Sequence, residues 1–356
     1  MKKILLLILM VGCFWSCNLK NGDDSFYLEK DTKAVAERVK IDTVGFYEDF
    51  IYAKNFWVYQ DSILVVHNRN YEDGYFLEFY ELSENRLITK LFRYGNGPNE
   101  LLSANVDLNK NELIVNDFVK GQVVFVDIDS LLQGFPVKEP IKHYVFGAPT
   151  AVRYKDDCLL LENPDCFQDE KLRIDNKESR FIVACGDFMY EPTEDYRYFV
   201  RNVAVDGRII TNYKKNRIFH ASMHEPLLQM YDTDLNLLKK IKGPDNLPPD
   251  YRVVGNTGGR EEVVFKKGHI PFTYLNFCAN EEFFCLAYMG DYLLDNTNIE
   301  DYPFWIFKFD WDGNIVDSYT LGRYVSSISL SADGQTMYAT VFSDEKNPFL
   351  IKFAIK

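Results

Sequence analysis

Residues 79–100 read FYELSENRLITKLFRYGNGPNE and contain the two local signals that decide the fold. In the first, an apolar segment reaches an aromatic–acidic step, crosses a polar turn and resumes, which predicts a β-hairpin. In the second, GNGPNE, two glycines allow positive φ and a proline sets the exit direction. The second signal therefore predicts a link from the outer strand of one sheet to the inner strand of the next.

Two patterns recur along the chain. The hairpin pattern occurs at Phe79–Ile88, Phe125–Asp129, Met230–Leu238 and Phe309–Val316. A second pattern, a polar pair that opens a strongly apolar strand, begins at Asp61, Asn111, Asp156, Asp206, Asn280 and Asp333. Six units of roughly fifty residues, each with four short strands, predict an all-β chain folded as a six-bladed β-propeller with four-stranded blades. An aromatic content of 15% also favours sheet.

The ring of blades needs a closing strand. The last unit stops at its third strand, Phe349–Ile355, and the segment Arg38–Val44 has the composition of a strand. We expect this N-terminal strand to pair with the C-terminal blade, because that pairing removes an exposed sheet edge.

The N-terminus predicts export. Lys2 and Lys3 precede Ile4–Val11, an apolar run too short to span a bilayer but typical of a signal peptide. The run leads to Ser16-Cys17, which resembles the lipobox of bacterial lipoproteins. Cys17 is the predicted lipidation site. Cys13 is the alternative but leaves a shorter signal, and plain secretion or an uncleaved anchor are further alternatives.

The expected organisation is a signal peptide at 1–17, a flexible tether at 18–37 and the propeller at 38–356. A lipid anchor would hold the protein at a membrane surface without a spanning helix. The expected location is the cell envelope as an outer-membrane lipoprotein. Asp23-Asp24 resembles the acidic patches that direct some lipoproteins to the cell surface.

Together these features resemble the TolB-like six-bladed propeller family, which includes lipoproteins of gut anaerobes. Gly95, Gly97, Pro98 and Glu100 form the G-x-G-P-x-E motif that carries the resemblance, which covers residues 38–356. Members commonly have glycine where this chain has Asn99, and asparagine tolerates the same left-handed backbone. The resemblance implies the fold and export, and no particular activity.

The glycines of this motif do not predict a phosphate site. A phosphate loop requires a helix directly behind its glycines, and the residues after Glu100 (LLSANVDL) predict a strand. Glu100 is expected either to bind backbone N–H groups of the turn or to face the central channel.

Function is expected on one face of the propeller, where long loops gather. The loops expected there span residues 163–179, 214–225 and 290–303, with an inter-blade insertion at 243–272. The residues predicted to bind at the channel mouth are Glu100, Arg201, Asn202, Tyr251 and Tyr302. The predicted partner is a glycan, a peptide or an envelope protein. A net charge of −13 argues against nucleic acid.

An enzyme is the alternative: a lyase or hydrolase with a polar or metal site at the channel mouth. A scaffold in an envelope complex is a third possibility. The sequence assigns no catalytic residue, metal ligand or cofactor. His220 and His224 are expected in a loop without a third ligand, and Asp310–Asn314 reads as a turn rather than a calcium loop. Cys158 and Cys166 are spaced so that a disulfide can bridge one loop.

Overall fold

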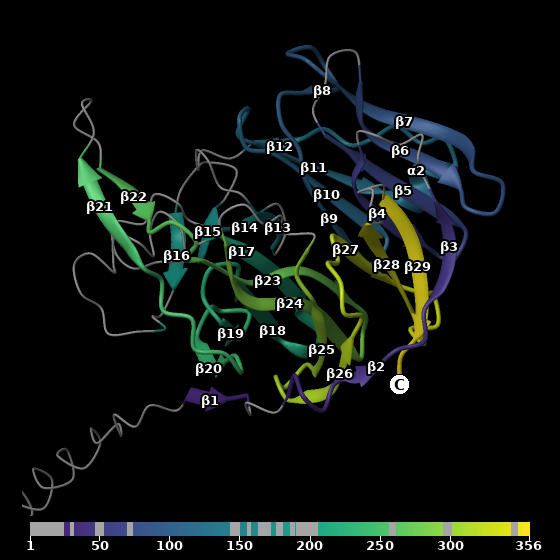
Figure 1. Ribbon diagram of the computed structural model, residues 1–356. Coiled ribbons are helices and arrows are strands. Elements are labelled where there is room, and N and C mark those ends of the chain that lie inside the picture. The colour runs from purple at the N-terminus through teal and green to yellow at the C-terminus, as the bar shows by residue number, and fades with distance from the viewer. Residues whose placement is uncertain are drawn as a thin grey trace, which may run out of the picture.

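The computed structural model describes residues 25–28, 32–46, 53–69, 74–142, 150–154, 158–162, 172–175, 181–185, 189, 206–255, 261–294, 301–342 and 348–356. In this part of the chain the helical segments are one short α-helix, α2 (Ile128–Leu132), and one 3-10 turn, η2 (Tyr213–Lys215). Among these residues there is no helix with the length and apolar character needed to cross a membrane. The rest is β-structure arranged as a propeller (Figure 1).

The strands form six sheets of four or five strands and one separate hairpin. Sheet 1 contains β4 (Ala53–Tyr59), β5 (Ile63–Asn68), β6 (Tyr75–Glu81), β7 (Arg86–Tyr94) and β8 (Glu100–Leu101). Sheet 2 contains β9 (Asn105–Asn109), β10 (Glu112–Asp117), β11 (Gln122–Asp127) and β12 (Ile141–Lys142). Sheet 3 contains β13 (Ala151–Arg153), β14 (Leu159–Glu162), β15 (Leu172–Asp175) and β16 (Phe181–Cys185).

The second half of the chain repeats this arrangement. Sheet 4 contains β17 (Gly207–Asn212), β18 (Arg217–Ser222), β19 (Leu227–Tyr231) and β20 (Leu237–Lys242). Sheet 5 contains β23 (Ile270–Ala279), β24 (Phe283–Leu293), β25 (Trp305–Asp310) and β26 (Ile315–Thr320). Sheet 6 contains β27 (Ser327–Leu330), β28 (Thr336–Phe342), β29 (Pro348–Ala354) and the N-terminal strand β3 (Asp42–Phe46).

Sheet 6 is completed from the other end of the chain. β3 pairs antiparallel with β29, with Phe46 opposite Phe349 and Asp42 opposite Lys352. The pairing expected between the two ends of the chain is therefore present, and the strand starts at Asp42 instead of Arg38.

Neighbouring sheets share clusters of apolar side chains. Phe56 and Leu350 pack together between sheets 1 and 6, and Phe219 and Phe284 between sheets 4 and 5. Other clusters join sheets 1 and 2, sheets 2, 3 and 4, and sheets 5 and 6. A sheet whose two faces both pack against neighbours needs apolar residues on both sides of its middle strands. β24 meets this requirement, with eight consecutive buried residues from Phe283.

The fourth sheet differs from the sequence interpretation. In the other five units the polar pair opens the second strand of its sheet, whereas the segment after Asp206 is the first strand of its sheet, β17. Two adjacent apolar segments, β17 and β18, are separated by the turn η2, so the local pattern fits either of them as the second strand. Residues 214–225, expected to be a loop, consequently contain the buried strand β18.

One further expectation about local structure is corrected, and another is met. After Phe125 the chain does not form a tight hairpin but enters α2, whose first turn is capped by the Asp127 carboxylate accepting from Ser130 N at 2.7 Å. The insertion between sheets 4 and 5 is present and forms the hairpin β21 (Tyr251–Gly255) and β22 (Glu261–Phe265), which projects from the body (Figure 1).

Part of the predicted tether is bound to the propeller. β1 (Ser25–Tyr27) pairs in parallel with β20, and β2 (Glu37–Arg38) pairs in parallel with β26. Leu28 is buried, and Lys33 lies 2.8 Å from the Asp245 carboxylate and 4.1 Å from the Trp305 ring centroid. We call residues 25–28 and 32–38 the N-terminal strap. The predicted signal peptide, Cys13 and Cys17 lie outside the described residues.

Candidate functional site

The GNGPNE link is a self-contained turn. The Glu100 carboxylate accepts a hydrogen bond from Gly97 N at 2.6 Å, and a Cβ at Gly95 would lie 2.2 Å from the same carboxylate. Asn99 has φ 58°, the left-handed conformation expected for it. Glu100 was expected either to bind backbone N–H groups of the turn or to face the central channel, and its carboxylate binds the backbone of the turn.

A polar pocket lies where the first strands of the six sheets begin. Its volume is about 320 Å³, and all six sheets or the links leading into them contribute to its wall. The links between sheets reach this side of the molecule, which is the side expected to carry function. The lining residues used below are Lys54, Asn55, His67, Asn105, Asp107, Asp206, Arg208, Phe272, Asn276 and Tyr324.

Arg208 is held firmly at this pocket. Its Nε donates to Leu275 O at 2.9 Å, and its Nη1 donates to Gly207 O at 2.8 Å. Asp107 lies 3.9 Å from Nε, at the long end of an ion pair. Because two carbonyls fix the guanidinium, its charge has a defined position at the pocket wall.

Lys54, in the same pocket wall, differs from Arg208 in its exposure and its bonding. It is solvent-exposed and forms no hydrogen bond or ion pair with any residue that the structure describes. Desolvation of the ammonium by the surrounding protein lowers the pKa of Lys54, and the positive charge of Arg208 lowers it further. Its charge is therefore available to a ligand.

Amide and aromatic side chains complete the wall. Asn55, Asn105 and Asn276 come from three different first strands, β4, β9 and β23. Phe272 and Tyr324 are half-buried aromatic residues of the same pocket. Amides that donate and accept, next to aromatic faces, are suited to a ligand with hydroxyl groups on an apolar ring.

His67 contributes a buried polar atom. Its side chain is 2% exposed and stacks on Trp57 at 6.1 Å, and its Nδ1 has no hydrogen-bond partner among the described residues. Burial lowers the pKa of His67 to about 3, and the charge of Lys54 acts in the same direction. The ring is therefore neutral at physiological pH.

A carboxyl–histidine pair lies behind one side of the pocket. Glu162 Oε1, at the end of β14, is 3.2 Å from His220 Nε2 on β18, and both side chains are fully buried. Burial raises the pKa of Glu162 to about 8, so the carboxyl is protonated at neutral pH and donates to Nε2. A Cβ on Gly207 would lie 2.2 Å from Ala221 O and 2.9 Å from Nε2, so only glycine fits here.

Asp206 connects this pair to the pocket. It lines the pocket, and burial raises its pKa to about 6. His224 Nδ1 lies 2.9 Å from Pro271 O and donates to it, and burial lowers the pKa of His224. His220 and His224 thus have separate partners, and in the described residues no three His, Cys, Asp or Glu side chains are placed to hold a metal ion.

The pocket was not predicted from the sequence. Arg201 and Asn202 lie outside the described residues, so their role stays a prediction. Tyr251 lies on β21, Tyr302 is buried with its hydroxyl accepting from Leu294 N at 2.7 Å, and Glu100 closes its own turn. None of these three residues lines the pocket.

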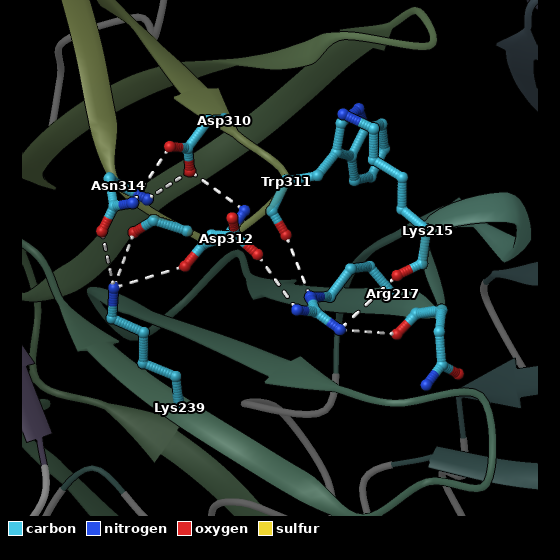
Figure 2. Close-up of polar contacts among 9 residues, drawn as sticks. Lys215, Arg217, Lys239, Asp310, Trp311, Asp312 and Asn314 are labelled. Carbon is cyan, nitrogen blue, oxygen red and sulfur yellow. Dashed lines mark hydrogen bonds and ion pairs between the residues drawn. The ribbon is translucent and has the colours of Figure 1, made fainter.

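The Asp310–Asn314 segment is a hairpin turn, as expected. The Asp310 carboxylate accepts from the backbone N–H of Asp312 at 3.0 Å and Asn314 at 2.8 Å. Asp232 and Asn236 repeat this arrangement in sheet 4. Figure 2 shows the Lys239 ammonium reaching the carbonyls of this turn and Arg217 donating to Trp311 O, so side chains of sheet 4 cap a turn of sheet 5.

The cysteines give no evidence of a functional site. Cys278 and Cys285 are buried opposite one another on β23 and β24, and burial raises the pKa of the Cys278 thiol. Cys166 lies outside the described residues, so the bridge to Cys158 stays a prediction.

The chain belongs to the TolB-like 6-blade propeller-like family, whose model matches residues 54–333. Among solved structures it is similar to a Bacteroides fragilis protein for which export has been suggested, with 12% identity, a TM-score of 0.53, and 93% of this chain and 99% of that chain covered. It is also similar to a DUF4221 family member from Bacteroides vulgatus, with 11% identity, a TM-score of 0.53, and coverage of 90% and 96%. At such identities the likeness concerns the fold alone. No functionally curated protein matches.

Proposed function

We propose that this protein is a closed six-bladed propeller that binds a glycan in the pocket where its first strands begin. Six sheets, apolar clusters between successive sheets, and the pairing of β3 with β29 support the blade number and the closure. The description of the family as six-bladed agrees with this number.

The glycan assignment depends on one observation: amide and aromatic side chains from separate sheets converge on one pocket. Asn55, Asn105 and Asn276 offer donors and acceptors to hydroxyls, and Phe272 and Tyr324 offer apolar faces to sugar rings. A peptide or an envelope protein would instead favour a broad apolar patch or groove. The net charge of −13 makes nucleic acid an unfavourable partner.

A glycan array probed with the purified full-length chain tests this proposal. The detergent must lack a sugar headgroup, so that it does not compete. Asn276→Ala removes one amide that makes no hydrogen bond within the described structure, and we expect it to weaken binding about tenfold. Asn314→Ala, far from the pocket in a turn, is the matched control. An array without hits, or hits that Asn276→Ala leaves unchanged, would contradict the proposal.

The proposed location is the cell envelope, with the chain attached to the outer membrane by lipid on Cys17 alone. The signal-like N-terminus and its Ser16-Cys17 step support this location. Labelling cells with a palmitate analogue tests it. Cys17→Ala should abolish labelling and Cys13→Ala should not, and the reverse result would move the lipid to Cys13.

An enzyme is the second candidate, and Asp206 favours it. This residue lines the pocket with a pKa raised to about 6 and is backed by the Glu162–His220 pair. A carboxyl that titrates near neutrality can serve as a general acid or base in a lyase or hydrolase. Incubating array hits with the protein and with Asp206→Asn, then separating products by mass, tests it. Unchanged glycan in both samples would exclude this role for those ligands.

A further inference from the structure

We infer that the glycan carries an acidic substituent, a carboxylate or sulfate, which binds between Lys54 and Arg69. This inference rests on the glycan-binding function proposed above and narrows it to anionic sugars. It comes from a second cavity that adjoins the pocket.

The second cavity has a volume of about 690 Å³ and continues from the first. The two share Lys54, Asn55, His67, Asn105, Tyr324 and Ser326 in their walls. A sugar ring held by the amides of the first pocket would therefore direct its substituents into the second. The combined space is large enough for more than a single small ligand group.

The charge of the second cavity is unusual for this protein. Among the described residues, Lys54 and Arg69 line it and no carboxylate does. The chain as a whole carries a net charge of −13, so a cavity wall with two cations and no described carboxylate is contrary to its composition. Lys54 also lines the first pocket, where Asp107 and Asp206 accompany Arg208, and the charge of Asp107 raises the pKa of Lys54 in opposition to the two arginines.

Within the part of the chain that the structure describes, both cations lack a partner for their side chains. Neither Lys54 nor Arg69 forms a hydrogen bond or ion pair with a described residue, and both are solvent-exposed. They are close enough for the charge of Arg69 to lower the pKa of Lys54. Two like charges at this separation repel one another, and an anion between them relieves the repulsion. Arginine and lysine both form charge-assisted hydrogen bonds to carboxylate and sulfate oxygens.

The wall around the cations supports an oriented ligand. His67 Nδ1 is buried at the shared boundary without a hydrogen-bond partner in the described structure, and its ring is neutral. A neutral imidazole can donate to or accept from a sugar hydroxyl, depending on its tautomer. The junction therefore offers one neutral polar atom beside two positive charges, which matches a hydroxylated ring with an acidic substituent.

Matched sugars test the inference by calorimetric titration of the full-length chain. Galactose, galacturonate and galacturonate methyl ester share a ring but only galacturonate is charged, and galactose 6-sulfate replaces the carboxylate. We expect the anions to bind about tenfold more tightly than the neutral sugars, an advantage that salt weakens. Comparing galacturonate with galactose 6-sulfate decides which acid the site prefers.

Three variants separate this inference from the function on which it rests. Lys54→Gln and Arg69→Gln should remove the advantage of the anions and leave neutral sugars unchanged, because neither side chain is bonded to a residue that the structure describes. Asn276→Ala should weaken charged and neutral sugars equally. Lys352→Gln, an exposed lysine on β29 outside both cavities, is the control and should change nothing.

Each outcome bears on one proposal. Equal affinity for galactose and galacturonate, or an anion advantage that survives both glutamine variants, would overturn the anionic site and leave glycan binding standing. Acetate or sulfate that binds as tightly as the acidic sugars would show an anion site without sugar recognition. Failure of every sugar to bind would reject glycan binding and the inference together.

Discussion

Replacing Glu162 by glutamine should make the protein more stable at alkaline pH and flatten the dependence of its stability on pH. Glu162 is fully buried against His220, and burial raises its pKa from 4.5 to about 8. Between these values the folded chain holds a proton that the unfolded chain releases. Stability from this group is therefore complete below about pH 4.5 and is lost as the pH rises through about 8.

The size of the effect follows from the interval between the two pKa values. Each pH unit corresponds to about 1.36 kcal/mol, so an interval of about 3.5 units gives an upper limit of about 5 kcal/mol. Glutamine has the shape of the protonated carboxyl and can donate to His220 Nε2, but it does not ionise. We expect Glu162→Gln to match the wild type near pH 5 and to exceed it by about 2–4 kcal/mol at pH 9.

Urea unfolding followed by tryptophan fluorescence at pH 5 to 9 measures this difference. Asp206 also has a pKa raised from 3.8 to about 6, so the variant should still lose a smaller amount of stability as the pH rises from about 4 towards 6. Glu282→Gln, at an exposed position, is the control and should keep the wild-type pH profile. A variant that loses stability at all pH values, or keeps the wild-type slope, would refute the assigned protonation of Glu162.

Three further substitutions test a close backbone contact beside the pocket, a capped hairpin turn and the N-terminal strap. Gly207→Ala places a Cβ 2.2 Å from Ala221 O and should cost about 1–3 kcal/mol of unfolding free energy. Gly255→Ala, the control, has no atom within 4 Å of its new Cβ and should leave the unfolding free energy unchanged. Equal effects of the two substitutions would contradict the close contact at Gly207. Lys239→Met removes the ammonium 3.2 Å from Gly313 O and should lower the unfolding free energy by about 0.5–1.5 kcal/mol in urea unfolding. An unchanged unfolding free energy would show that water satisfies the turn carbonyls equally well. Leu28→Ala should lower the unfolding free energy by about 2 kcal/mol or more and speed amide hydrogen exchange in β1 and along the edge of β20. Unchanged exchange there would show that this side chain does not hold the strap.

The sequence predicted several local structures correctly. Gly97, Asn99 and Glu100 form the expected turn because the bond from Gly97 N to the Glu100 carboxylate that closes it lies within a few residues. Asp310 and Asn314 form the expected hairpin for the same reason. The boundaries in sheet 4 were wrong because β17 and β18 are equally apolar, so local pattern alone cannot rank them. The strap was missed because its partners, Asp245 and Trp305, lie more than two hundred residues away.

The amino-acid sequence by itself determined the class of protein: an all-β chain of repeated hairpins with turns set by glycine, asparagine and aspartate. Only the tertiary structure decided where ligands meet the chain. Lys54, Arg208 and Asn276 carry no local motif, and they share one pocket because the sheets bring the starts of their first strands together. A turn depends on residues that are neighbours in the sequence, so the sequence predicts it. A pocket depends on residues that only folding brings together, so the sequence did not predict which residues line it.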